Sequence, residues 1–306
     1  MSIAMIDYDA HNWLQHFFDI KGSMVREIIV RVLSCVIVAT AVAAGHQYWR
    51  PLDMSDKPHS LIGVALGLLL VFRTNASYDR FWEGRKQWGS IVNESRNLAR
   101  LASTLLHGDR ALLERLVRWG MAFPWAVMYA LRGEKRLRPA SSFSEEEIRR
   151  VTESDHVPLA IARRMSADIA GARRRGLVDG YAHMTLDQNV QLLVDYMGAC
   201  ERIHKTPLPF AYVVHLRRAL FLYCLSLPFA LVAAFGWWTI PVTFAVAYIL
   251  FGIEEIGVEI EDPFGVDDND LPLERICGNI EANLRAMLEQ PVEEPAAAAS
   301  GDPSAP

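Results

Sequence analysis

A run of acidic side chains near the C-terminal end is the densest set of potential metal ligands in the sequence. Its members are Glu254-Glu255, Glu259, Glu261-Asp262 and Asp267-Asp268-Asn269-Asp270. Carboxylate oxygens on a glycine-containing turn suit hard cations such as Ca²⁺ or Mg²⁺. The spacing does not match an EF-hand, which needs a twelve-residue loop ending in a bidentate glutamate. The simpler interpretation, which the run taken alone favours, is a helix break whose acids cap a following helix over 273–288.

A second candidate is a line of large apolar side chains on one helical face. Val64, Leu68 and Phe72 fall at i, i+4 and i+8 within the uncharged run 61–72. Spacing alone favours an ordinary packing stripe. In a ring of identical subunits the same side chains would form stacked apolar rings, and hydrophobic constrictions of that kind gate channels by dewetting.

The segment that follows, 73–85, is dense in charged and aromatic side chains. Within it Arg80 and Glu83 stand three residues apart and can pair on a helix. No Ser/His/Asp signature, nucleotide-binding loop or dinucleotide fingerprint occurs in the sequence. The four cysteines lie far apart without a CxxC pair, so neither a zinc ribbon nor a redox dithiol is supported.

The placement of these residues depends on three apolar stretches, 28–45, 61–72 and 219–252. They account for a hydrophobic content of 51% and a mean hydropathy of +0.12. A helix of about 20 residues crosses a hydrocarbon core of about 30 Å. The first stretch can therefore cross a bilayer, with Arg31 snorkelling to the interface. The third is long enough for a hairpin, divided near Gly236-Trp237-Trp238.

The second stretch is short for a membrane span. It can serve as one if other helices shield it from lipid or if it lines a water-filled path, and its small residues suit close helix packing. Four spans place both termini on one side of the membrane. Basic residues flank those ends, whereas the loop 48–57 balances its charges. The positive-inside rule then predicts cytoplasmic termini for a multi-pass protein of the cell (inner) membrane.

The chain is therefore expected to be an all-α membrane protein with four transmembrane helices and a large helical cytosolic region. Its net charge of -5 argues against a nucleic-acid partner. The expected parts are an N-terminal cytosolic segment 1–25, spans one and two 26–73, a cytosolic helical region 74–210, spans three and four 211–257, an acidic loop with a C-terminal helix 258–290, and a disordered tail 291–306.

Several motifs resemble the bestrophin family in its bacterial form. They are the segment 73–85 with Trp88-Gly89, the run Pro207-Leu208-Pro209-Phe210-Ala211-Tyr212, the run Ile260-Glu261-Asp262-Pro263-Phe264-Gly265 with its following acids, and Lys21-Gly22-Ser23. The resemblance covers about 20–100 and 199–284, more than half of the chain. The region 104–194 shows no matching motif.

The resemblance implies a homopentameric ion channel in which the second span lines the pore. Val64, Leu68 and Phe72 would then be three neck rings, and Leu208 would form a narrow cytosolic aperture. Animal members bind calcium at an acidic loop, which here corresponds to the side chains of Asp267 and Asp270 and to backbone oxygens near Glu259 and Asp262. This chain departs from that pattern because Val266 and Asn269 replace acids.

The sequence requires no cofactor, and the expected partners are further copies of the chain, membrane lipid and small monovalent ions. Because the neck rings are uncharged, chloride-type anions and sodium-type cations both remain candidates. One alternative is a membrane prenyltransferase in which Asp267, Asp268 and Asp270 hold magnesium and a diphosphate, although no second acid-rich motif is present. Another is a membrane-anchored scaffold that binds a partner through the basic loop 133–138.

Overall fold

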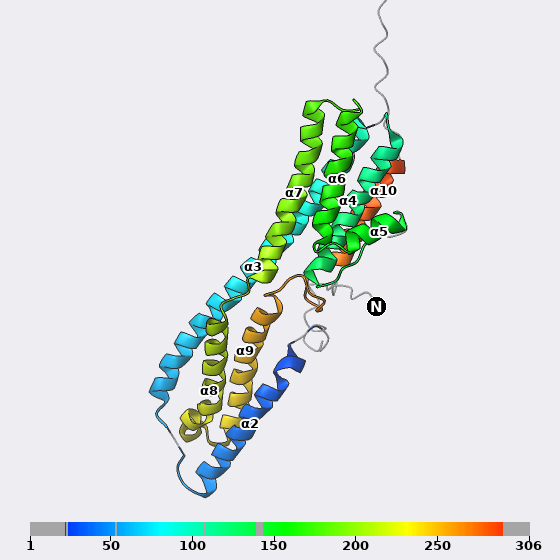
Figure 1. Ribbon diagram of the computed structural model, residues 1–306. Coiled ribbons are helices and arrows are strands. Elements are labelled where there is room, and N and C mark those ends of the chain that lie inside the picture. The colour runs from blue at the N-terminus through cyan, green and yellow to red at the C-terminus, as the bar shows by residue number, and fades with distance from the viewer. Residues whose placement is uncertain (1–21, 23, 53, 107, 139–142, 290–306) are drawn as a thin grey trace, which may run out of the picture. The chain divides into compact units, whose positions relative to one another are not determined.

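The computed structural model describes residues 22, 24–52, 54–106, 108–138 and 143–289, and every regular element in those ranges is a helix (Figure 1). The all-helical prediction is therefore confirmed. The expected tail 291–306 and nearly all of the expected segment 1–25 lie outside these residues. Contacts divide the chain into two compact units, one formed by residues 1–85 and 202–271 and the other by 86–201 and 272–306.

The first unit is built from long apolar helices. They are α2 (Val25–Tyr48), the first part of α3 (Asp56–Leu105), α8 (Phe210–Phe235) and α9 (Thr239–Glu259), and α2 packs against both α8 and α9 (Figure 1). The short 3-10 helix η2 (Gly236–Trp238) separates α8 from α9, where the sequence predicts the hairpin break. Gly236 has a φ of 50°, a conformation that glycine adopts without steric cost.

The helix α3 is longer than the sequence suggests. The short apolar run 61–72 is only part of one helix of 50 residues, about 75 Å long. The sequence changes from apolar to polar at Arg73, but residues 73–105 contain no proline that would break a helix. The helix therefore continues through the change in polarity. Because a hydrocarbon core is about 30 Å thick, only part of α3 can lie within a bilayer.

One apolar cluster holds the four helices of the first unit together. Its buried members are Ile28, Val32 and Cys35 of α2, Leu66 and Leu70 of α3, Leu216, Leu220 and Cys224 of α8, and Ala247 and Phe251 of α9. Helix α3 thus buries only the face that carries Leu66 and Leu70. All four cysteines of the chain are free and buried.

The second unit is organised around α4 (Arg110–Leu131), which packs against α6 (Val157–Arg174) and α10 (Leu273–Glu289). The second unit also contains the last part of α3, the helix α5 (Glu145–Thr152) and the helix α7 (Gly180–Lys205), whose last residues belong to the first unit. Local sequence fixes the helix starts: the Asp109 side chain caps α4, and Ser144 with Glu147 forms a capping box at α5.

Polar contacts join α4 and its C-cap residue to α10, among them one from Arg110 to the Leu288 carbonyl. The guanidinium of Arg132 donates to both carboxylate oxygens of Glu274, and the Trp125 indole donates to Glu281 Oε2 at 3.1 Å. Partial burial opposes ionisation of Glu274, but the hydrogen bond and charge of Arg132 outweigh it and lower the pKa of this carboxyl. The ionised form of Glu274 therefore stabilises the folded unit.

Replacing Glu274 with Gln is expected to destabilise the second unit by roughly 0.5–1 kcal/mol at pH 7, because the pair is partly exposed to solvent. Since the folded-state pKa is depressed, this stabilisation is fully present above about pH 5.5 and is lost as the pH falls through the folded-state value. Denaturant unfolding of wild type and variant between pH 3 and pH 8 measures the difference. A gap that stays constant across this range would contradict the assignment.

Candidate functional site

The three predicted neck residues lie on a face of α3 that no described residue covers. Val64, Leu68 and Phe72 are 75%, 56% and 59% exposed, whereas Leu66 and Leu70 on the opposite face are buried. The three side chains are therefore not a packing stripe within a single chain. An apolar face of this extent normally meets lipid, another protein surface or a channel interior.

The uncovered face continues beyond Phe72 at the same helical spacing, but its chemistry changes. Asn75, Tyr78, Asp79 and Trp82 are all exposed and follow the apolar residues on the same side of the helix. One continuous stripe of α3 is thus apolar in its first half and polar or aromatic in its second. An ion moving along this stripe would pass from a dry section to one that offers hydrogen-bonding groups.

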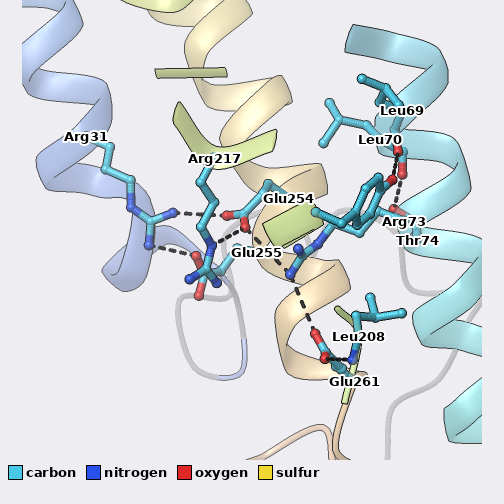
Figure 2. A network of polar contacts seen from close by, with 11 residues as sticks. Arg31, Leu69, Leu70, Arg73, Thr74, Leu208, Arg217, Glu254, Glu255 and Glu261 are labelled. Carbon is cyan, nitrogen blue, oxygen red and sulfur yellow. Dashed lines mark hydrogen bonds and ion pairs between the residues drawn. The ribbon is translucent and has the colours of Figure 1, made fainter. Parts of the chain in front are cut away.

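Arg73, the residue after Phe72, points to the other side and is only 1% exposed. Its Nη2 lies 3.7 Å from Glu254 Oε1 and 3.7 Å from Glu261 Oε2 (Figure 2). Gly257 of α9 makes room for it, since a Cβ at that position would lie 3.2 Å from Arg73 Nε. None of the three guanidinium nitrogens has a hydrogen-bond partner within the described part of the chain.

Glu254 is the centre of this buried network. Its carboxylate accepts from Arg217 Nε at 2.8 Å and from Arg31 Nη1 at 3.3 Å, and Arg31 Nη2 donates to Glu255 at 2.7 Å (Figure 2). The network thus contains three arginines and three glutamates, so its formal charges balance. Its members are Arg31, Arg73, Arg217, Glu254, Glu255 and Glu261, from α2, α3, α8, α9 and the loop after α9. Removing one member of such a network leaves an uncompensated buried charge.

The expectation that Arg31 snorkels to the membrane interface stays a prediction, and the structure adds that Arg31 has partners within the chain. Its guanidinium pairs with Glu254 and Glu255. Sequence reasoning missed the network, although a signal was present. Arg31, Arg73 and Arg217 each stand inside or at the edge of an apolar stretch, as do Glu254 and Glu255. Charges in such places almost always pair with one another.

The motif segment 73–85 contacts the motif segment 260–265 and the residues 202–206, which directly precede the motif 207–212. Arg80 donates to the carbonyls of Glu261 at 2.9 Å and Ile203 at 2.6 Å, and also to that of Thr206. Glu83 pairs with Arg202 at 2.6 Å. The suggested Arg80–Glu83 pair is thus replaced by contacts with other segments, because helix-terminal carbonyls attract the guanidinium.

Leu208 lies in the loop between α7 and α8 and is half-buried. Its amide donates to Glu261 Oε1 at 2.9 Å, as Figure 2 shows. Shortly after it, the Tyr212 hydroxyl donates to the Leu69 carbonyl of α3 at 3.0 Å. The loop is thus anchored at both ends, and its assignment as an aperture stays a prediction.

The acidic residues suggested as metal ligands contact groups of the chain itself. Asp270 is buried and accepts from the Asp267 amide at 2.7 Å. Glu259 accepts from Asn269, and Asp262 contacts His204 Nδ1 at 3.1 Å. Among the described residues, no group of three or more His, Cys, Asp or Glu side chains could hold a metal ion. The carboxylates of Glu259, Asp262 and Asp270 contact nitrogen atoms of neighbouring residues.

Comparisons with known proteins match nearly the whole chain. The sequence model for the Bacterial/Fungal Bestrophin protein family matches residues 5–286. A voltage-dependent anion channel-forming protein of Nostoc sp. is 39% identical over 282 residues, which are 89% of this chain and 91% of that protein. A protein of the same description from Synechocystis sp. is 38% identical over 296 residues, 91% of this chain and 92% of its own length.

Solved structures give the same result. The crystal structure of a bacterial bestrophin homologue from Klebsiella pneumoniae has a TM-score of 0.81 and 32% identity, and the match covers 86% of this chain and 99% of that one. The family resemblance read from the motifs is thereby confirmed. It also extends across the region 104–194, where no motif was recognisable.

Replacing Gly84 with Ala is expected to lower stability by about 1–3 kcal/mol, because a Cβ there would lie 2.9 Å from the Pro263 ring and 3.0 Å from Phe264. Gly198 of α7 is the matched control, since a Cβ there meets nothing within 4 Å. Its replacement with Ala should be neutral or slightly stabilising. Thermal unfolding of both purified variants measures the difference, and equal effects would refute the close contact.

Replacing Glu254 with Gln should cost about 3–5 kcal/mol, because Arg73 would lose one of its two acidic neighbours in a buried site. Glu255 is the matched control: it pairs only with the half-exposed Arg31, so its Gln variant should cost about 1 kcal/mol. The measurement is the yield and thermal stability of each variant in detergent. A larger loss at Glu255 would show that Glu254 is not the centre of the network.

Proposed function

Because the chain belongs to the bacterial and fungal bestrophin family, whose members are ion channels and not enzymes, we propose that it forms a homopentameric channel for small monovalent ions. The observation that carries this proposal is the uncovered apolar face of α3. Val64, Leu68 and Phe72 are the proposed neck rings, and all three are exposed in the part of the chain that the structure describes.

A ring of subunits explains why this face is uncovered. The opposite face of α3 is buried among α2, α8 and α9, so the helix is fixed with its neck residues turned outward from its own subunit. Four helices cannot enclose a path by themselves, and closed cyclic symmetry lets each copy contribute the same face to a central axis. Apolar rings there would exclude water at their narrowest point and close the path by dewetting.

The remaining exposed apolar residues suggest where lipid would contact the subunit. Val30, Leu33 and Ile37 of α2 are exposed, and α2 is long and apolar enough to cross a membrane. The stretches 56–105 and 210–259 meet the same criterion, the latter containing both α8 and α9. We therefore propose four crossings of the inner membrane, with both termini and the region 74–210 in the cytoplasm.

We propose that the permeant ion is a small anion of the chloride type. The relatives from Nostoc and Synechocystis are named as anion channel-forming proteins, which supports this sign. The neck rings themselves carry no charge and so do not discriminate by sign. Leu208 is the proposed second constriction, at the cytosolic aperture. The proposed channel function does not require calcium, and the suggested calcium ligands Glu259, Asp262, Asp267 and Asp270 stay a prediction.

The structure supports the two alternative functions, a prenyltransferase and a scaffold, less well than a channel. A prenyltransferase would need its aspartates free to hold a magnesium–diphosphate complex, whereas Asp270 is buried and engaged with the Asp267 amide. A scaffold that binds a soluble partner would give the α3 stripe no role.

Replacing Leu68 or Phe72 with Ala is expected to raise the single-channel current several-fold, because each change widens an apolar ring and lowers the cost of hydrating the neck. Purified protein in planar bilayers under asymmetric potassium chloride measures current and reversal potential together. The wild-type reversal potential should lie toward the chloride equilibrium value.

The matched control is Ile37→Ala, which removes a comparable apolar side chain from an exposed site on α2. It should leave the current unchanged. A reversal potential near the potassium value would refute the anion assignment. Pentamers that carry no current under any gradient, or an equal response to Ile37→Ala, would refute the proposed neck.

A further inference from the structure

We propose that Arg80 and Glu261 are positioning residues that clamp the loop segment 203–208, which includes the end of α7, onto the neck helix α3, so that the aperture is set from the same helix as the neck. This inference rests on the proposed channel function. The clamp consists of contacts between residues that are far apart in the sequence. All of these residues belong to the first unit.

Arg80 uses its planar guanidinium to hold three main-chain carbonyls at once. Nε donates to Glu261 O at 2.9 Å, Nη2 to Ile203 O at 2.6 Å, and Nη1 to Thr206 O. Ile203 belongs to the last turn of α7, and Glu261 follows the end of α9. Carbonyls at helix ends lack intrahelical partners, and a positive charge is favourable there. A lysine ammonium cannot reproduce this fork.

Glu261 holds the other side of the loop. Its Oε1 accepts the amide proton of Leu208 at 2.9 Å, and its Oε2 lies 3.7 Å from Arg73 Nη2 (Figure 2). Arg73 directly follows Phe72, the last proposed neck residue. The Leu208 backbone is thus linked through a single carboxylate to the residue that adjoins the neck.

Two further contacts bind the flanks of the loop to α3. Arg202, just before the loop, pairs with Glu83, and Tyr212, just after it, donates to the Leu69 carbonyl. These contacts and those of Arg80 reach α3 between Leu69 and Glu83. A displacement of α3 that widens the neck would therefore carry the loop with it, and neither Arg80 nor Glu261 needs to touch the ion.

The test is the relative permeability of a large and a small monovalent anion, gluconate and chloride, measured from reversal potentials of the full-length protein in planar bilayers. We expect Leu208→Ala to raise the gluconate-to-chloride ratio at least two-fold. Arg80→Gln should raise it comparably, and the double variant should show no further increase, because both changes act on one constriction. Combined with Phe72→Ala, in contrast, the effect of Arg80→Gln should multiply.

The control is Arg100→Gln, an exposed arginine elsewhere on α3, which should leave the ratio unchanged. Arg80→Lys keeps the charge without the fork and should give an intermediate ratio. If Arg80→Gln does not assemble, the gluconate-to-chloride ratio of Arg80→Lys alone tests the clamp. A merely structural contact would lower protein yield without moving the ratio.

The outcomes separate the clamp from the aperture. If Leu208→Ala raises the ratio and the Arg80 variants do not, the clamp is refuted and the aperture stands. If the Arg80 variants raise it and Leu208→Ala does not, the clamp is supported and the assignment of Leu208 is wrong. If neither does, both are refuted. Effects of Arg80→Gln and Leu208→Ala that simply multiply would also refute the clamp.

Discussion

The structure of the first unit depends on how it accommodates charge within an apolar bundle. Arg73 is almost wholly buried, and an isolated guanidinium in such a place would be very costly. Glu254 and Glu261 compensate it, and Arg31 and Arg217 in turn complete the environment of Glu254. Because these partners come from α2, α3, α8, α9 and the loop after α9, correct packing of the helices and correct pairing of the charges require each other.

This requirement fixes the rotation of α3. With Arg73 held inward and Leu66 and Leu70 in the apolar cluster, the opposite face of the helix must point outward. The exposure of Val64, Leu68 and Phe72 is therefore a consequence of the buried face and not a separate feature. The buried contacts on one face of α3 thus fix the orientation of the exposed apolar face opposite. A symmetric assembly needs such a fixed orientation, because every copy must present the same face.

Sequence reasoning recovered what depends on local patterns. Hydropathy located the apolar helices, and the run Gly236-Trp237-Trp238 marked the break between α8 and α9. In the structure Gly236 has a positive φ, which an α-helix does not contain. Sequence reasoning did not predict that α3 is one continuous helix. A change from apolar to charged residues alters what surrounds a helix, but it does not lower the helix propensity of the residues. The partners of Arg31 and Arg80 were also out of reach, because residues up to 224 positions apart meet only after folding. The neck face came from spacing and family resemblance together, and only the structure showed that the chain leaves it uncovered.

The burial of the native thiols has a practical consequence. All four cysteines are free and buried, and burial raises the pKa of Cys277, so little of it is present as the reactive thiolate at neutral pH. Maleimide and methanethiosulfonate reagents should therefore spare the unmodified chain. A spectroscopic label attached to a cysteine introduced at an exposed position such as Tyr181 would then report from that position alone, in an otherwise native background.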